Sequence, residues 1–337
     1  MDKWSNSGAI LQLDSYKGYH TKTLGDRGLK IPKNIAYEYY RYTEDTPKRI
    51  ISIKRLSDIA YLEYLELSYS GPLTTFLTDI KNFIVRFTLG GTNIQELPLS
   101  LLMNLNEPII SGEKVYINLC FDMLFGKLVL IGLQYSEVTV DLVGDDISCI
   151  TKFSIVSKQS YVEGLERKHL IKPFQECIQQ ISFMHIVPDG NIGETNIVYS
   201  VNLDFIHISK GIFIECDNVN DLSCIKLRFN NLERFNLDRF LILTKCKKIT
   251  QSLLYLPFNY NMDYLERTIE SYEGSANLSA IDHINIIFAF EKPTSYVKIY
   301  NLYLNIYTQE QGMGSTLFPC LRLGIIHKIT TCNTVIV

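Results

Sequence analysis

Apolar and polar residues alternate with a period of two along most of the chain after residue 50. Every second residue is apolar in residues 83–89, 115–121 and 138–142. Successive side chains of a β-strand point to opposite faces of a sheet, so each segment is predicted to be a strand with one buried face. Gly90-Gly91 directly after the first segment indicates a tight turn, because glycine tolerates a positive φ.

The same alternation returns in the second half of the chain. It runs through residues 197–205, 225–229, 284–290 and 301–307. In the last segment the leucine and isoleucine positions are predicted to face the core. The polar and tyrosine positions are predicted to face outward, where they would suit protein interfaces. These outward positions are Asn301, Tyr303, Asn305 and Tyr307.

Residues 157–180 separate the two β-rich blocks. This stretch is charged and contains several glutamines, and Pro173 interrupts it. It is predicted to be a connector with a short helix on each side of Pro173. Many short strands at regular spacing are typical of a β-sandwich or barrel. The lack of helix-length periods between the strands argues against a parallel sheet with crossover helices.

Residues 1–50 show little periodicity and contain Pro32 and Pro47. They are predicted to form an irregular arm, of which Met1–Lys48 is predicted to extend towards an inner face or a neighbouring molecule. Four tyrosines close together favour docking of this arm on a surface. They are Tyr37, Tyr39, Tyr40 and Tyr42.

Composition limits the classes of function that fit. The chain has 337 residues, of which 46% are hydrophobic and 20% are charged, so it can bury a core. Its formal net charge of −3 argues against a protein that coats nucleic acid directly, because such proteins are usually basic. No apolar run approaches the eighteen or so residues of a membrane span, and the first ten residues do not resemble a signal peptide. We therefore expect a soluble protein made inside the cell.

No pattern in the sequence predicts a catalytic or metal site. The eight cysteines contain no Cys-x-x-Cys pair, and the six histidines form no metal-binding spacing. Gly144-Asp145-Asp146 lacks a second aspartate on a neighbouring strand, so it is predicted to be an acidic turn. Gly312-Met313-Gly314 follows a strand and does not open a helix, which predicts a turn and not a phosphate loop. No catalytic residue, metal or cofactor is expected, and function is expected to reside in surfaces.

Five stretches, in chain order, carry a family resemblance. In ISIKRLSDIAYLEYLELSYS the matching positions include Arg55 and Asp58, and in FTLGGTNIQELP they include Gly90 and Gly91. The third stretch is YINLCFDMLFGKLVLIGLQYSEVTV. Its matching positions are Leu133, Gln134, Tyr135, Glu137 and Val138.

The fourth stretch, YVEGLERKHLIKPFQ, matches at Glu166, Arg167 and Gln175. The fifth, GSANLSAID, matches at Asn277, Ser279, Ile281 and Asp282, and Gly312, Met313 and Gly314 follow a later strand. Together the stretches resemble the major capsid proteins of the nucleocytoplasmic large DNA viruses. Four positions depart from the family pattern: Ser57, Gln95, Ser136 and Ala280.

This resemblance implies an all-β fold of two consecutive eight-stranded antiparallel jelly-roll barrels, a double jelly roll with a short helical connector. The implied domains are an N-terminal arm at 1–50, the first jelly roll at 51–165, the connector at 166–180, the second jelly roll at 181–318 and a tail at 319–337.

The resemblance also implies a structural role without enzymatic activity or cofactors. The chain would trimerise into pseudo-hexameric capsomers that tile an icosahedral shell in the virion, after assembly in the host cytoplasm. Its partners would be itself, minor capsid proteins under the shell and, indirectly, an internal membrane, with no direct contact to nucleic acid. A non-virion assembly scaffold of the same fold and a minor capsid or vertex protein stay open as alternatives. A cellular carbohydrate-binding or hydrolytic jelly roll would need paired carboxylates in a cleft.

The signature residues are expected to hold the fold in register. Asn277, Ser279 and Asp282 are short polar residues just before an apolar strand, and such side chains bond nearby backbone groups. If Asp282 is buried, it should have a basic or backbone donor as its partner, because an unpaired buried carboxylate is unfavourable.

Overall fold

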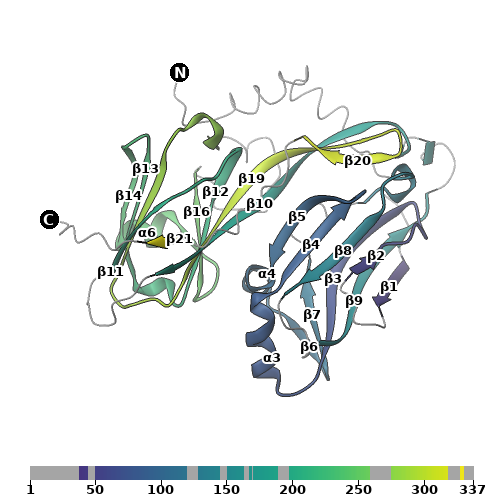
Figure 1. Cartoon of the computed structure of the whole chain (residues 1–337), viewed down its shortest axis with the longest axis horizontal. Coiled ribbons are helices and arrows are strands. Elements are labelled where there is room, and N and C mark those ends of the chain that lie inside the picture. The colour runs from purple at the N-terminus through teal and green to yellow at the C-terminus, as the bar shows by residue number, and fades with distance from the viewer. Residues whose placement is uncertain are drawn as a thin grey trace. The chain divides into compact units, whose positions relative to one another are not determined.

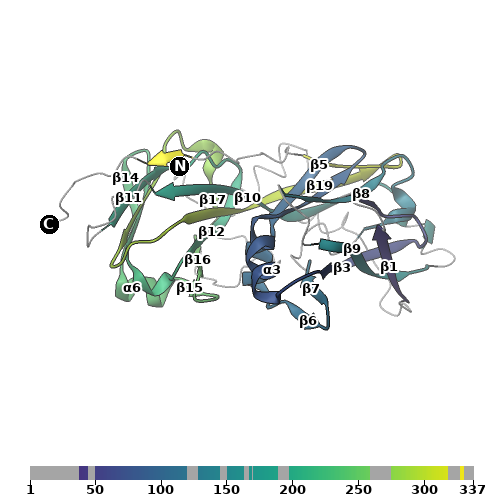
Figure 2. The same cartoon turned by 60° about the horizontal axis from the view of Figure 1, so that its bottom comes forward.

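A computed structural model covers the chain, and Figures 1 and 2 show it from two sides. The structure describes residues 38–44, 50–119, 128–144, 150–162, 167–168, 170–188, 197–258, 275–317 and 327–329. The described residues fall into two compact units. The N-terminal unit takes those within Lys22–Gln180 and Asn305–Cys320, and the C-terminal unit takes those within Ile181–Leu304 and Leu321–Val337. The domain limits that the family resemblance implies stay a prediction.

The N-terminal unit is built from two antiparallel sheets with the strand orders β1-β9-β3-β7-β6 and β2-β8-β4-β5. The strands are β1 Glu38–Glu44, β2 Ile50–Ser52, β3 Ile59–Tyr69, β4 Ile84–Leu89, β5 Thr92–Pro98, β6 Ile109–Ser111, β7 Lys114–Asn118, β8 Val138–Val143 and β9 Ile150–Ser160. Its short helices are α3 Leu73–Asp79, η1 Ile80–Asn82, α4 Leu99–Leu105 and η2 Leu130–Gly132.

The C-terminal unit repeats this architecture. Its sheets have the orders β11-β18-β13-β14 and β15-β16-β12-β19-β10-β21, with β17 on β12 and β20 on β19. The strands are β10 Phe174–Pro188, β11 Ile197–Asn202, β12 Ile208–Cys216, β13 Leu222–Phe229, β14 Leu232–Asp238, β15 Lys247–Lys248, β16 Leu253–Pro257, β17 Ala276–Asn277, β18 Ile284–Phe290, β19 Val297–Glu310, β20 Met313–Thr316 and β21 His327–Ile329. The short helices are η3 Val219–Asp221, α6 Arg239–Lys245 and η5 Leu278–Ala280. The start of β10 up to Gln180, the end of β19 from Asn305, and β20 belong to the N-terminal unit.

The two units match strand for strand. The order β1-β9-β3-β7-β6 corresponds to β10-β19-β12-β16-β15, and β2-β8-β4-β5 corresponds to β11-β18-β13-β14. If the short edge strands β6 and β15 and the additional strands β17, β20 and β21 are left out, eight strands remain in each unit. Numbered from one to eight, they form a 1-8-3-6 sheet and a 2-7-4-5 sheet, which is the jelly-roll order. β10 pairs with β21 in parallel, whereas the other strand pairs with a defined register are antiparallel.

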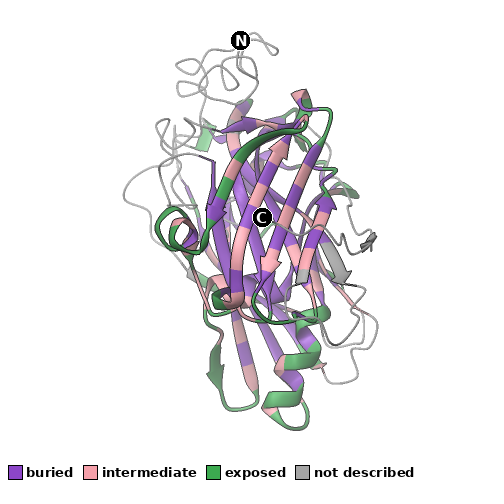
Figure 3. Ribbon diagram, turned by 90° about the vertical axis from the view of Figure 1, so that its left-hand side faces the viewer, coloured by how far each residue is buried: buried purple, intermediate pink, exposed green. Residues whose placement is uncertain are grey.

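The predicted alternation places one face of most strands in a core. In β18 every second residue from Ile284 to Phe290 is buried, and β8 shows the same pattern from Val138. Figure 3 shows this as alternating buried and intermediate segments along neighbouring strands. β12 differs, because all nine of its residues are buried. A strand that is buried on both faces reads as a continuous apolar run, and this matches Gly211-Ile212-Phe213-Ile214.

The two units also share a tight hairpin. Gly90 and Gly91 connect β4 to β5 with φ of 55° and 79°, and Asn230 and Asn231 connect β13 to β14 with φ of 50° and 65°. Positive φ at both central residues is the requirement of a type I′ turn, whose twist suits antiparallel strands. The strand register shifts two residues before each turn, between Phe87 and Thr88 and between Leu227 and Arg228. Sequence identity is not needed for this repetition, because glycine and asparagine both tolerate a left-handed backbone.

Part of the predicted arm is a strand. β1 pairs along its whole length with β9, so the prediction of an irregular segment is wrong for residues 38–44. Tyr42 is buried and donates a hydrogen bond from its hydroxyl to the Lys54 carbonyl oxygen at 2.9 Å. Burial also raises the pKa of this hydroxyl above its usual value. Tyrosine at alternate positions was the signal for this strand. Residues 1–37, and the predicted role of that part of the arm, lie outside the described residues.

The connector is only partly helical. Arg167, Lys168 and Leu170 have helical backbone, whereas the predicted helix after Pro173 is instead the beginning of β10. The β-sheet neighbours of β10 outweigh the weak helical preference of its glutamines.

The prediction of outward tyrosine and asparagine positions on β19 is also wrong. Tyr307 is 5% exposed and the other three positions are fully buried. Asn305 donates from Nδ2 to Gln180 Oε1 at 2.6 Å, and Gln180 donates from Nε2 to the Ile94 carbonyl oxygen at 2.7 Å. These bonds satisfy amides in the interior, where an unpaired polar group is unfavourable.

We predict that replacing Gly91 with valine will destabilise the protein without any steric clash. A Cβ atom at Gly91 would meet no heavy atom within 4 Å, so the penalty comes from φ alone. Forcing a β-branched residue into the left-handed region should lower the free energy of unfolding by about 1–2 kcal/mol. Gly91→Asn is the matched control and should lose much less. Denaturant unfolding followed by circular dichroism measures both, and equal midpoints for Gly91→Val and the parent would contradict the proposed turn.

Candidate functional site

Signature residues from three distant parts of the sequence meet in the N-terminal unit. The Gly90 amide donates to the Glu137 carbonyl oxygen at 2.8 Å, and the Tyr135 amide donates to the Gly312 carbonyl oxygen at 2.8 Å. The Gly314 amide donates to Ser136 Oγ at 3.2 Å. We call this group the glycine junction: Gly90, the segment Leu133–Val138 and Gly312–Gly314. Its backbone bonds connect the β4–β5 turn, the segment before β8 and the β19–β20 turn.

Glycine is required at two positions of the junction for different reasons. Gly312 has a φ of 80°, and a Cβ atom there would lie 2.6 Å from Tyr135 Cδ2. At Gly314 a Cβ atom would lie 2.7 Å from Tyr307 Oη and 2.8 Å from Leu133 Cδ2. Any side chain would force these neighbours apart. The signature glycines therefore allow β20 to pack closely against the segment before β8.

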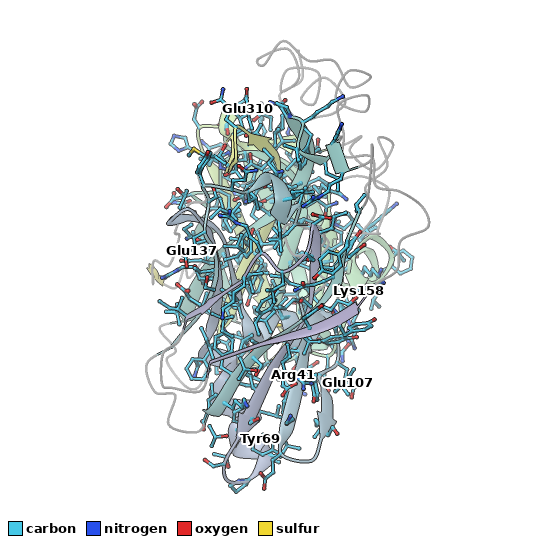
Figure 4. The ribbon with its side chains drawn as sticks, turned by 90° about the vertical axis from the view of Figure 1, so that its right-hand side faces the viewer. Arg41, Tyr69, Glu107, Glu137, Lys158 and Glu310 are labelled. Carbon is cyan, nitrogen blue, oxygen red and sulfur yellow. The ribbon has the colours of Figure 1, made fainter. Side chains whose placement is uncertain are left out.

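The junction also presents two apolar side chains to solvent. Tyr135 is 76% exposed and Met313 is 59% exposed, whereas Leu133 and Val138 are buried in the core. Glu137 is exposed and accepts a hydrogen bond from Ser52 Oγ at 2.9 Å. Figure 4 labels Glu137 at the surface of the N-terminal unit. The buried signature residues hold the junction, and the exposed ones are available for contacts with another molecule.

A second group connects the start of β3 to the connector. Asp58 is 5% exposed. Its Oδ2 accepts the Val162 amide at 2.8 Å, and its Oδ1 lies 3.1 Å from Arg167 Nε. These contacts bring Asp58 from the first signature and Arg167 from the fourth into one ion pair. Since the Arg167 side chain is 55% exposed, the pair is partly screened and the amide bond is the stronger constraint.

The third group surrounds η5 in the C-terminal unit. Ser279 Oγ accepts the His207 amide at 2.8 Å, and the Leu278 amide donates to the His207 carbonyl oxygen at 2.9 Å. His207 has a φ of 78°, and these two bonds hold its strained backbone at the start of β12. Asn277 pairs with Ile208 through the backbone of β17. The predicted structural role of this signature is therefore carried by Ser279 and by backbone bonds.

Asp282 does not behave as expected. Its side chain is exposed, and no described residue bonds to it. The expectation of a paired carboxylate applied only to a buried Asp282, and that condition is not met, so Asp282 does not carry the structural role expected of this signature. The preceding Ile281 is 9% exposed. Among the other signature residues, Arg55 and Gln134 are exposed, and Gln175 is half-buried on β10. Glu166 lies outside the described residues.

The described part of the chain offers no obvious chemical centre. It contains no group of three or more potential metal ligands, and none of its helices is long and apolar enough to cross a membrane. Four described cysteines are free thiols, and burial raises the pKa of Cys216 and of Cys246 to about 12. Such thiols stay protonated near neutral pH and are poor nucleophiles.

Comparison with known proteins identifies the fold. No family model matches the sequence, and no curated protein matches it. The model of the PBCV-1 virus capsid superimposes with a TM-score of 0.66 and 15% identity, covering 86% of this chain and 98% of that one. The crystal structure of PBCV-1 VP54, fitted into a reconstruction of the virophage Sputnik, gives 0.64 and 14% over 86% and 99%. The chain therefore has the double jelly-roll fold, as the resemblance implied.

We predict different effects for two signature aspartates. Asp58→Ala should lower the free energy of unfolding by about 1–3 kcal/mol, because it leaves the buried Val162 amide without its acceptor. Asp282→Ala should change it by no more than about 0.5 kcal/mol, as is usual at an exposed position. Urea unfolding of the two variants beside the parent tests this difference. A midpoint for Asp58→Ala that equals that of Asp282→Ala would contradict the assigned role of Asp58.

Proposed function

We propose that this chain is a structural major capsid protein whose trimers form pseudo-hexameric capsomers of an icosahedral viral shell. The observation that carries this proposal is the repetition of one jelly-roll strand order in two units of the same chain. A single chain thus supplies two lobes of equal architecture and unequal surface. Three chains around a threefold axis supply six such lobes in a closed ring, which suits a hexagonal lattice.

The properties of each unit suit this role. Closely paired antiparallel sheets with buried faces are rigid, and few of their edges are free to add strands from other chains. Several large apolar side chains are nevertheless exposed at positions that do not support the core. Those above 50% exposure are Tyr39, Ile50, Ile109, Tyr135, Tyr161, Leu232, Phe240, Leu243 and Met313. Exposed apolar patches often mark interaction sites, and a shell requires many modest contacts of this kind.

The fold likeness supports a capsid role. The compared structures are a virus capsid and a protein fitted into a virus reconstruction, and this chain covers almost the whole length of both. The proposal places the protein in the virion capsid after assembly in the host cytoplasm. Its partners are further copies of itself and minor capsid proteins under the shell, which separate it from the genome and from an internal membrane. A net charge of −3 is in keeping with the absence of direct nucleic-acid binding.

We predict that the purified protein forms a trimer with hexagonal outline. Light scattering should give three times the 38.8 kDa of one chain, and negative-stain images should show particles with six lobes. A stable monomer at high concentration would contradict the proposal. The copy number in purified particles separates the alternatives, since a scaffold would be absent and a vertex protein would be rare.

A further inference from the structure

Among the described strands of the N-terminal unit, β6 has a free edge. It ends the order β1-β9-β3-β7-β6, and its three residues are all exposed, with Ile109 56% and Ile110 47% exposed. An edge strand presents N–H and C=O groups that can pair with another chain. The equivalent strand of the C-terminal unit, β15, consists of two lysines, which protect an edge against such pairing. β6 lacks this protection, so its edge is suited to accept a further strand.

Two carboxylates flank β6. Glu107 precedes the strand and Glu113 lies in the turn after it, and both are exposed without an ion pair to any described residue. Arg41 and Lys114 of the same sheet pair instead with the buried Glu66, at 2.8 Å and 2.9 Å. Figure 4 labels Glu107 and Arg41 among the side chains of the N-terminal unit. The β6 edge therefore carries a negative charge at each end.

The segment before β1 contains a short sequence of the opposite charge. Residues 27–33 read RGLKIPK, and residues 107–113 read EPIISGE. When the two are written in opposite directions, a basic residue stands opposite each glutamate. Proline then stands opposite proline, isoleucine opposite isoleucine and glycine opposite glycine. Five of the seven positions are therefore complementary in charge or identical.

This alignment limits the added strand to three residues. Gly28 and Pro32 bracket Leu29–Ile31. Glycine weakens a strand, and proline cannot donate to a strand ladder because it lacks an N–H. β6 also has three residues and lies between Pro108 and Gly112. The two segments therefore match in length as well as in charge.

One copy cannot place this segment on its own β6. Thr43 of β1 and Ile109 of β6 lie in the same row of the five-stranded sheet. A strand added beyond β6 is five strand spacings from β1, about 24 Å, and Glu38 lies about 17 Å back along β1 from Thr43. Together these offsets separate Glu38 from the place of Ile31 by about 29 Å. Seven residues extend to at most about 25 Å, so the segment must come from a second copy.

We infer that residues 29–31 of one copy add an antiparallel strand to β6 of a second copy. Arg27 then lies beside Glu113 and Lys33 beside Glu107, and opposite charges at facing positions stabilise paired strands. The apolar side chains of the two strands shield each other from water. This inference deepens the proposed function and rests on it, because the partner is another copy of the same assembling chain.

The test is a disulfide cross-link in the full-length protein. In the inferred register Lys30 lies directly opposite Ile110. Opposite residues of paired strands have Cα atoms about 4.5–5.5 Å apart, which suits a disulfide. Under mild oxidation, the double variant Lys30→Cys with Ile110→Cys should form species of two or three times 38.8 kDa on a non-reducing gel. The matched control is Lys30→Cys with Lys248→Cys, since Lys248 is exposed on the equivalent edge strand β15.

A charge exchange in the same cysteine variant tests the two ends of the contact. Glu107→Lys with Glu113→Lys should slow cross-linking about fivefold or more, because like charges would then face each other at both ends. Adding Arg27→Glu with Lys33→Glu should restore the parental rate, since the charges are exchanged and complementary again. The two single cysteine variants measure any background from the native cysteines, and their cross-linking should be much slower.

Three outcomes would overturn the inference. The first is a link that stays at the mass of one chain, because the arm would then reach its own β6. The second is equal cross-linking of the Lys248→Cys control, and the third is a charge exchange that does not restore the rate. Light scattering of the parent separates the proposed function from the inference. A parent that forms no trimer would overturn that function, whereas a trimeric parent whose cysteine variant forms no link would overturn only the inference.

Discussion

Both units depend on the need to bury the facing sides of two antiparallel sheets while every strand keeps hydrogen-bonded neighbours. In each unit the third and eighth strands lie inside the larger sheet, as β3 with β9 and β12 with β19. A strand inserted between others needs partners on both sides, and those partners come from distant parts of the chain. The jelly-roll order is one of the few connections that provides them without leaving a long free edge.

The hydrogen bonds of the buried polar side chains are a consequence of the same requirement. β19 is a 14-residue strand that is buried over almost its whole length, so its asparagines and tyrosines need partners inside the protein. Asn305 and Gln180 supply one such chain of amide bonds, and Tyr300 donates to the buried Glu215. Each bond contributes only about 1 kcal/mol, but leaving one of these groups unpaired would be more unfavourable than the bond is favourable. The buried amides therefore favour one strand register over its neighbours.

The signature residues act at the ends of strands. The glycine junction, the Asp58 group and the Ser279 group each connect a turn or loop to a segment far away in the sequence. Their described contacts are backbone hydrogen bonds, one ion pair and close packing at glycine. Their contribution is to hold rigid jelly rolls at fixed loop geometry, which leaves the outer surfaces free to differ between the two units. The contrast between β6, which is apolar and exposed, and β15, which consists of two lysines, shows how one architecture can present different side chains at the same place.

Local sequence determined the strands, since period-two alternation depends only on which side chains avoid water. This predicted the positions of β4, β7, β8, β13 and β18, and the paired glycines predicted the first hairpin. Local sequence did not predict that β1 is a strand, and it predicted the wrong exposure for the tyrosines and asparagines of β19. Whether such a side chain is buried depends on which other segments of the chain pack over it. It also misjudged Asp282, whose exposure depends on the direction of the chain after η5. Only the tertiary structure decided which signatures meet, and that β6 lies at a sheet edge, because both depend on pairing and packing between residues far apart in sequence.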